Sequence, residues 1–227
     1  MTAAAIRHLI AYPIGIGAAY MFVRQCRKPA GWLGRRVARA MNLSHARLTE
    51  WGLSRVRIEP DWHILDIGCG GGQTIRSMAA LAPAGRIEGI DYARASLEVA
   101  REKNGDLIAS GRVAIQQASV SSLPFPDASF DLITAVETHY YWPDLVHDFR
   151  EVLRVAKPGG CIVVIAEAYR GRPMDWLYLP VMRVLLRATY LSPEQHRSAL
   201  SDAGFTAVEI HIEPSRGWIC AVGIKPR

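Results

Sequence analysis

The chain has 227 residues, of which 50% are hydrophobic, and its formal net charge is +6. A chain of this length can bury a substantial core as one domain, which excludes a small domain that depends on metal or disulfide staples. Its cysteines show no paired spacing, so we expect them to be reduced and structural, as suits a cytoplasmic protein. Because no basic motif interleaved with aromatic residues occurs, nucleic acid is the least favoured partner.

The positive charge is concentrated at the N-terminus. Residues 1–60 have a net charge of +8, so the rest of the chain carries about −2. Residues 9–23 contain no charged side chain and are too few to span a bilayer. We interpret residues 1–28 as an apolar and basic arm. The arm packs on the domain, contacts an anionic membrane surface or is disordered, and the sequence leaves these three alternatives open.

A helical segment is predicted after the arm. Pro29 and Gly31 mark a break, and helical spacing resumes over residues 34–50. Residues 29–60 therefore form a helical segment in front of the first predicted strand.

From residue 61 onward, strand and helix patterns alternate. This order predicts a parallel α/β sheet. The predicted strands are 63–67, 86–91, 112–117, 130–136 and 160–167, and the predicted helices are 72–82, 93–104 and 144–155. Asp144 can cap the last of these helices and Gly159 can end it. Two late strands, 206–212 and 217–224, are separated by a turn and predict a final antiparallel hairpin.

The first strand ends in a glycine-rich turn. Gly68, Gly70 and Gly72 permit a ligand to lie against the main chain, where a Cβ would block it. The dinucleotide fingerprint requires its third glycine at position 73, which is Gln73 here. Asp66, just before the turn, would repel a pyrophosphate and attract an ammonium group. The turn therefore favours a cationic ligand without phosphate.

Three further segments follow this turn. The second strand ends in Asp91, about twenty residues on, where a carboxylate can bind ribose hydroxyls. Residues 123–133 read LPFPDASFDLI, and residues 149–160 read FREVLRVAKPGG. Together with the glycine turn, these segments resemble the motifs of class I S-adenosylmethionine-dependent methyltransferases. Over residues 62–167 the chain is similar to the type 11 methyltransferase domain.

The resemblance implies a fold and a cofactor. The fold is α/β and Rossmann-like, a seven-stranded mostly parallel sheet with an antiparallel last strand, helices on both faces and an N-terminal helical extension. The cofactor is S-adenosyl-L-methionine, with S-adenosyl-L-homocysteine as its product. The resemblance makes residues 61–227 the methyltransferase domain, with a lid insertion at about 170–192. In such folds the segment before the first strand often closes over the site, which makes pocket-wall candidates of Trp32, Met41, His45 and Trp51.

The cofactor-binding residues are also carried over from the resemblance. Asp66 would receive the amino group of the donor, Asp91 would hold its ribose and Tyr92 would cover its adenine. Many relatives have an acidic residue where this chain has Ser119, which leaves the adenine amino contact open. The full expected set is Asp66, Gly68, Cys69, Gly70, Gly72, Asp91, Tyr92, Ser119, Val120 and Val136, and we assign no metal ligand.

The acceptor site is expected where the fourth and fifth strands end, because the carboxyl ends of parallel strands face the ligand crevice. Glu137 could pair with an amine, and His139 could accept a proton. Tyrosine rings could contact a cationic methyl group. The candidate catalytic residues are His139, Tyr140 and Glu137, and the candidate substrate-binding residues are Tyr141, Trp142, Glu167, Tyr169 and Trp176.

Three functional hypotheses follow. The first is a methyltransferase that acts on N, O or C of a small, partly hydrophobic acceptor. The second is a membrane-surface phospholipid or peptide methyltransferase that uses residues 1–28, which would make the protein cytoplasmic but membrane-associated. The third is a nicotinamide-dependent oxidoreductase or a donor-binding protein without catalysis, which Gln73 and the later motifs disfavour.

Overall fold

The computed structural model describes residues 23–172 and 175–227 of the chain. Most of the predicted N-terminal arm therefore lies outside the described residues. In the part that is described, no helix is long and apolar enough to cross a membrane.

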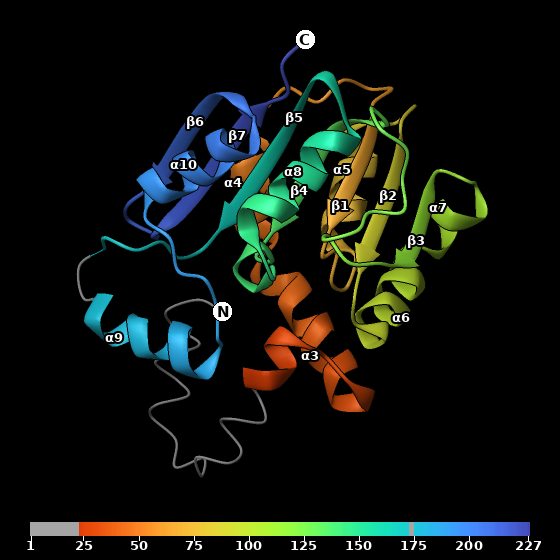
Figure 1. Cartoon of the computed structure of the whole chain (residues 1–227). Coiled ribbons are helices and arrows are strands. Elements are labelled where there is room, and N and C mark those ends of the chain that lie inside the picture. Colours follow the sequence, from red (N-terminus) through yellow and green to blue (C-terminus); the bar gives the residue numbers. More distant parts are fainter. Residues whose placement is uncertain (1–22, 173–174) are drawn as a thin grey trace.

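Seven strands form one mixed sheet in the order β3-β2-β1-β4-β5-β7-β6 (Figure 1). The first five strands are parallel, and β7 pairs antiparallel with both β5 and β6. The strands are β1 (His63–Ile67), β2 (Arg86–Asp91), β3 (Val113–Gln117), β4 (Phe130–Val136), β5 (Ala156–Ala166), β6 (Thr206–Glu213) and β7 (Trp218–Ile224). This arrangement confirms the predicted fold class and the final hairpin.

Helices cover both faces of the sheet. On one face, α8 and α10 bury Phe149, Val152 and Leu200 against the strands. On the other face lie α4, α5 and α6, and Leu48, Met78 and Leu97 enter a second core. Figure 1 shows α8 and α10 on the opposite side of the sheet from α4 and α5. The bounds are α4 (Ala46–Leu53), α5 (Gln73–Leu81), α6 (Arg94–Lys103), α7 (Gly105–Ala109), α8 (Leu145–Val155) and α10 (Pro193–Ala203).

Helix α3 (Gly31–Ser44) lies beyond the carboxyl ends of the parallel strands (Figure 1). Exposed ion pairs join it to α6, with 3.1 Å between Arg35 and Glu98 and 2.6 Å between Arg39 and Glu102. Such exposed pairs contribute little stability, and they accompany the direct packing of α3 on α6. The helix is thus placed over the edge of the sheet where ligands bind in folds of this kind.

The structure corrects several local predictions. The helical segment predicted over 34–50 consists of two helices, and α3 ends at Ser44, whose hydroxyl donates to the carbonyl of Met41. Asp144 caps α8 as predicted, accepting a bond from the amide of His147. Gly159 does not end α8: the helix stops at Val155, and Gly159 lies within β5 with φ of 79°. Helix α7 was not predicted.

The predicted insertion at 170–192 contains two short helices. These are α9 (Asp175–Pro180) and the π-helix η2 (Val181–Leu185). Tyr190 holds the end of this segment, since its hydroxyl donates to the carbonyl of Tyr169 at 2.7 Å. The segment lies near the same carboxyl edge as α3 (Figure 1).

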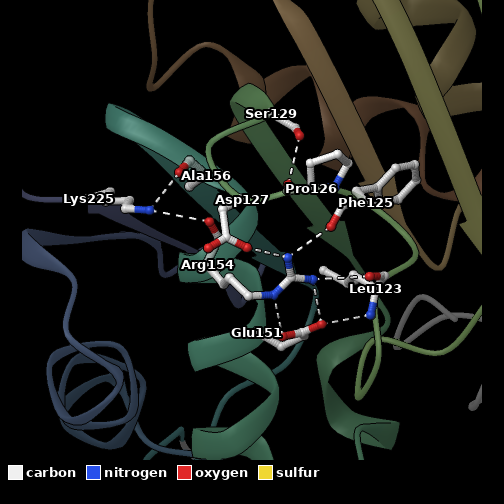
Figure 2. Close-up of polar contacts among 9 residues, drawn as sticks. All are labelled: Leu123, Phe125, Pro126, Asp127, Ser129, Glu151, Arg154, Ala156 and Lys225. Carbon is white, nitrogen blue, oxygen red and sulfur yellow. Dashed lines mark hydrogen bonds and ion pairs between the residues drawn. The ribbon is translucent and has the colours of Figure 1, made fainter.

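The segment between β3 and β4 is anchored by one side chain, Arg154 of α8. Its guanidinium donates to the carbonyls of Leu123 and Phe125 at 3.1 and 2.8 Å, and it pairs with Asp127 at 2.7 Å (Figure 2). Glu151 completes the network, accepting bonds both from Arg154 and from the amide of Leu123. This network ties the segment 123–133 to the segment 149–160.

Candidate functional site

The glycine turn lies between β1 and α5, and each predicted glycine has a positive φ. The values are 70° at Gly68, 52° at Gly70 and 79° at Gly72. A Cβ at Gly68 would overlap the side chain of Thr138, and one at Gly72 would overlap Asn104. A Cβ at Gly70 would meet nothing closer than 4.0 Å. Gly68 and Gly72 are therefore needed for close packing, whereas at Gly70 the backbone faces open space.

Asp91 connects the end of β2 to the glycine turn. Its Oδ2 accepts a bond from the amide of Gly70 at 3.0 Å, and its Oδ1 accepts one from the amide of Ala93 at 2.7 Å. Burial raises the pKa of Asp91 to about 6, although these amides favour the ionised form. The carboxylate thus holds the turn in place and still has lone pairs for a ligand.

Two cavities adjoin the turn. The smaller has a volume of about 90 Å³ and the larger about 640 Å³. The larger volume lies within the range of about 300–1,000 Å³ that is typical of small-molecule sites. The cavities share the lining residues Arg27, Gly68, Asp91, Tyr92, Thr138 and Tyr141. The shared walls make them two parts of one site.

The smaller cavity lies between the glycine turn and the N-terminal helices. Met41, Asn42 and His45 line it from the end of α3 and the residue that follows. The Asn42 amide donates to the carbonyl of Gly71 at 2.9 Å, which ties α3 to the turn. Two of the predicted pocket-wall residues, Met41 and His45, therefore lie at the site.

The other two predicted pocket-wall residues do not. Trp32 is 65% exposed on α3, with Arg36 over its ring. Trp51 packs on Trp218, with 5.8 Å between ring centroids. Their side chains belong to the surface and to the core respectively.

The larger cavity has polar, apolar and basic lining residues. Ser119 and Val120 line it next to Tyr141 and Trp142. Its basic lining residues come from the segment before α3 and from the end of the insertion, and they are Arg24, Arg27, Lys28 and Arg187. Arg27 lies 5.9 Å from the centroid of the Tyr141 ring. The cavity therefore fits a ligand that is partly aromatic or apolar.

Glu137 directly follows β4 and lines the smaller cavity. Its φ of 57° lies in the left-handed region that usually favours glycine. Its Oε1 accepts bonds from the amide of Glu167 and from the hydroxyl of Tyr140, the latter at 3.1 Å. Burial and the nearby Glu167 raise the pKa of Glu137 to about 8. The hydroxyl of Tyr140 thus orients the carboxyl group of Glu137. Tyr140 itself lies in a buried cluster with Tyr169 and Tyr190.

Most of the predicted site residues line one or both cavities. These residues are Gly68, Cys69, Gly70, Asp91, Tyr92, Ser119, Val120, Val136, Glu137, Tyr141 and Trp142. The remaining predicted residues, which line neither cavity, are Asp66, Gly72, His139, Tyr140, Glu167, Tyr169 and Trp176. Burial raises the pKa of the Cys69 thiol well above its usual value, which agrees with a packing role for this residue.

Asp66 lies beneath the turn and is almost fully buried. Its Oδ1 accepts a bond from the hydroxyl of Thr134 at 2.7 Å, whereas its Oδ2 has no hydrogen-bond partner among the described residues. Burial raises the pKa of Asp66 to about 7. A buried carboxylate oxygen without a partner, directly below a ligand loop, is an expected feature of a site that receives a cationic group.

His139 points away from both cavities. Its Nε2 lies 3.1 Å from Nε2 of His196, a buried residue of α10. Burial lowers the pKa of His139 well below its usual value. The 3-10 helix η1 (His139–Tyr141) explains this placement, because one tight turn sends His139 into the core and Tyr141 into the cavities.

Tyr169 and Trp176 also lie apart from the cavities. Tyr169 is buried, with Arg172 5.9 Å from its ring centroid. Trp176 is 71% exposed on α9. Several residues that line the smaller cavity were not among the predicted ones, namely Cys26, Arg27, Asn42, Thr49, Gln73, Thr74, Ser96 and Thr138. Position next to a predicted residue was the available signal for Asn42 and Thr138, whereas Cys26 and Arg27 were assigned to the arm.

The sheet is Rossmann-like, a glycine turn follows β1 and an acidic residue ends β2. These features define a class of nucleotide-binding α/β proteins. Comparison with known proteins identifies the family within this class. The family profile described as "Methyltransferase domain" matches residues 65–164. An O-methyltransferase of Pyrenophora dematioidea is 35% identical over 191 residues, which cover 82% of this chain and 71% of that protein. The chain belongs to the class I S-adenosylmethionine-dependent methyltransferases, as the resemblance implied, and it is therefore an enzyme. This membership also decides against the nicotinamide-dependent alternative.

Other relatives differ in the atom that they methylate. The ubiquinone/menaquinone biosynthesis C-methyltransferase UbiE of Ectopseudomonas mendocina is 29% identical over 196 residues, with coverage of 74% of this chain and 75% of the relative. A chain in the complex of the Haloferax volcanii Trm112 methyltransferase activator with a methyltransferase has the same fold, with a TM-score of 0.75 and 21% identity, over 85% of this chain and 94% of that one. The chain spans about half the length of several other curated relatives.

Proposed function

We propose that the protein transfers a methyl group from S-adenosylmethionine to a small, partly hydrophobic acceptor. The observation that supports this most directly is the bond between Asp91 and the amide of Gly70, which holds the glycine turn against two joined cavities. A carboxylate at the end of the second strand of such a sheet can bind ribose hydroxyls. The turn and the cavities together have the size and the polarity for a nucleoside that carries a cationic group.

The residues present fit this donor. At Gly70 the backbone faces open space, so a ligand can approach the main chain there. Asp66 Oδ2 would receive the donor's amino group, directly or through water, and Asp91 would hold the ribose. Tyr92, Ser119 and Val120 would surround the adenine in the larger cavity. Val136 and Cys69 line the smaller cavity, where the amino-acid part of the donor would lie.

The chemistry required of the chain is mainly alignment. When bound, S-adenosylmethionine supplies a methyl group that its sulfonium already activates. The chain's own residues then position the acceptor in line and exclude water. Tyr141 and Trp142 provide apolar walls for the acceptor, and the carboxyl group of Glu137 lies in the same cavity lining as Tyr141. We give His139 no part in this reaction, because it lies in the core beside His196.

The donor site is tested by calorimetric titration with S-adenosylhomocysteine. We expect Asp91→Ala to weaken binding at least about 10-fold, which corresponds to about 1.4 kcal/mol. The matched control is Asp202→Ala, which removes an exposed aspartate on α10 and should bind as the wild type does. A folded wild-type protein that does not bind S-adenosylhomocysteine would overturn the proposal. A screen for transfer of labelled methyl groups to hydrophobic amines, phenols and quinone-like compounds then identifies the acceptor.

A second candidate, a methyltransferase at a membrane surface, is favoured by the insertion. In α9 and η2, Trp176, Leu177 and Val184 are exposed, with Val184 75% exposed. The exposed Arg183 and Arg187 lie in the same segment. Val184 and Arg187 also line the larger cavity. An amphiphilic acceptor could therefore enter the cavity from an anionic lipid surface that binds this apolar and basic edge.

This second candidate is tested by cosedimentation of the full chain with vesicles of anionic and of neutral phospholipids. We expect binding to anionic vesicles only, and Trp176→Ser should weaken that binding. Trp32→Ser is the matched control, because Trp32 is equally exposed but lies on α3. Equal behaviour of the two variants, or no binding by the wild type, would exclude membrane docking through the insertion.

A further inference from the structure

Three potential metal ligands meet beside the smaller cavity, and two of them, His45 and Glu137, line it. One ligand atom each of His45, Glu137 and Glu167 lies within 4.8 Å of the other two. The residues come from different parts of the chain: His45 separates α3 from α4, Glu137 follows β4 and Glu167 follows β5. Their sequence spacing carries no metal motif, and the fold alone brings them together.

We infer that His45, Glu137 and Glu167 bind one divalent cation of the Mn²⁺ or Zn²⁺ type. One imidazole with two carboxylates is a mixed nitrogen and oxygen donor set, which suits these ions. Bonds of about 2.0–2.2 Å would require ligand atoms roughly 3.4 Å apart, so small side-chain rotations are enough to close the site around an ion.

The surroundings already orient these ligands. The hydrogen bonds of Glu137 to the described residues all use Oε1, which leaves Oε2 available to an ion. Outer hydrogen bonds of this kind commonly fix ligating carboxylates. Arg172 donates to the backbone carbonyl of Glu167 at 3.2 Å and so fixes the main chain beside the third ligand.

Charge also favours an ion at this place. The carboxyl groups of Glu137 and Glu167 lie together at a partly buried place, where two like charges repel each other. A divalent cation would neutralise the pair.

The site is open toward the proposed donor. His45 and Glu137 line the same cavity as Gly68, Gly70 and Thr138. Three protein ligands leave a coordination position for an oxygen or nitrogen of another molecule. Resting on the proposed function, the ion would hold the acceptor atom at the end of the donor cavity and lower the pKa of an acceptor hydroxyl.

Metal binding is tested on the full chain after treatment with a chelator. Equilibrium dialysis against Mn²⁺ or Zn²⁺ should give one ion per chain. Glu167→Gln and His45→Asn should each weaken binding at least about 10-fold, which is about 1.4 kcal/mol. Glu209→Gln is the control, because the Glu209 side chain is 68% exposed on β6. No bound ion in the folded wild type, or unchanged binding in both variants, would overturn the inference.

A spectroscopic measurement on the wild type avoids any effect of the variants on folding. The electron paramagnetic resonance of bound Mn²⁺ should show coupling to the nitrogen of one imidazole, and its absence would also overturn the inference. Titration of the same metal-free sample with S-adenosylhomocysteine separates the two proposals. Donor binding without any metal binding refutes only the metal site.

Discussion

At the scale of single residues, close packing constrains the glycine turn. Gly68 and Gly72 have positive φ, and each would overlap a neighbour if it carried a Cβ. Asp66 is an ionisable group in the core, with one oxygen bonded and the other without a partner among the described residues. The ligand site thus depends on residues whose effect on the stability of the fold can be measured by substitution.

Gly68→Ala should destabilise the protein more than Gly111→Ala. Both glycines have similar positive φ, 70° and 76°, so both variants incur the left-handed backbone cost of roughly 1–2 kcal/mol. Only the Gly68 variant also overlaps Thr138, whereas a Cβ at Gly111 meets nothing within 4 Å. Urea unfolding should show the difference, and calorimetry should show weaker S-adenosylhomocysteine binding for Gly68→Ala alone. Equal losses of stability in the two variants would contradict the destabilising overlap between a Cβ at residue 68 and the Thr138 side chain.

Asp66→Asn should stabilise the protein increasingly as pH rises. The folded pKa of Asp66 is raised from 3.8 to about 7 by burial, so the native state keeps its proton where the unfolded state has lost it. The wild type therefore loses stability from about pH 4 to pH 7, whereas the asparagine variant does not. Between pH 5 and pH 8 the difference should grow by about 2–3 kcal/mol.

Urea unfolding of both proteins at pH 5 and pH 8, with a chelator present, measures this difference. A constant difference between the two pH values would show that Asp66 is ionised throughout. Calorimetry on the same variant should show weaker donor binding, since asparagine cannot neutralise an ammonium group.

At the scale of elements, the segment between β3 and β4 is held by α8 rather than by its own backbone. Arg154 bonds two of its carbonyls, and Glu151 bonds one of its amides (Figure 2). Ser119 and Val120 begin this segment and form a wall of the larger cavity. The anchor therefore links a structural helix to the ligand site.

Arg154→Lys should lower stability by roughly 1–2 kcal/mol, because lysine keeps the charge but cannot bond two carbonyls and two carboxylates at once. Arg150→Lys on the same helix is the control, since Arg150 is exposed and makes one bond to the carbonyl of Asp202. Thermal unfolding measures both. Equal effects of the two substitutions would mean that the Arg154 network is not the anchor of the segment.

At the scale of the whole molecule, the site joins two parts of the structure. The smaller cavity lies between α3 and the carboxyl edge of the sheet. The hydrogen bond from the Asn42 side chain to the carbonyl of Gly71 closes it. The β6–β7 hairpin is at the far edge of the sheet (Figure 1). A ligand in the cavities should thus stabilise one edge of the molecule more than the other.

S-adenosylhomocysteine should slow amide hydrogen exchange in α3 and in residues 68–72, and leave exchange in β6 unchanged. The reason is that ligand contacts raise the free energy of local opening only where they are made. Exchange monitored by mass spectrometry, with and without the ligand, measures this. Uniform protection across both regions would indicate that α3 opens only by global unfolding.

The sequence by itself determined the class of fold, the glycine turn and the acidic end of β2. These follow from local patterns, because buried strands appear in the sequence as apolar runs and a backbone that lies against a ligand requires glycine. Side-chain direction beyond the strand ends depends on a single turn of helix, so His139 enters the core while Tyr141 enters the cavities.

Only the tertiary structure brought His45, Glu137 and Glu167 together, along with Cys26 and Arg27 at the cavities. Residues so far apart in the chain meet because the carboxyl ends of β4 and β5 are neighbours and α3 lies over them. No local pattern encodes that proximity, since it results from strand order and helix packing.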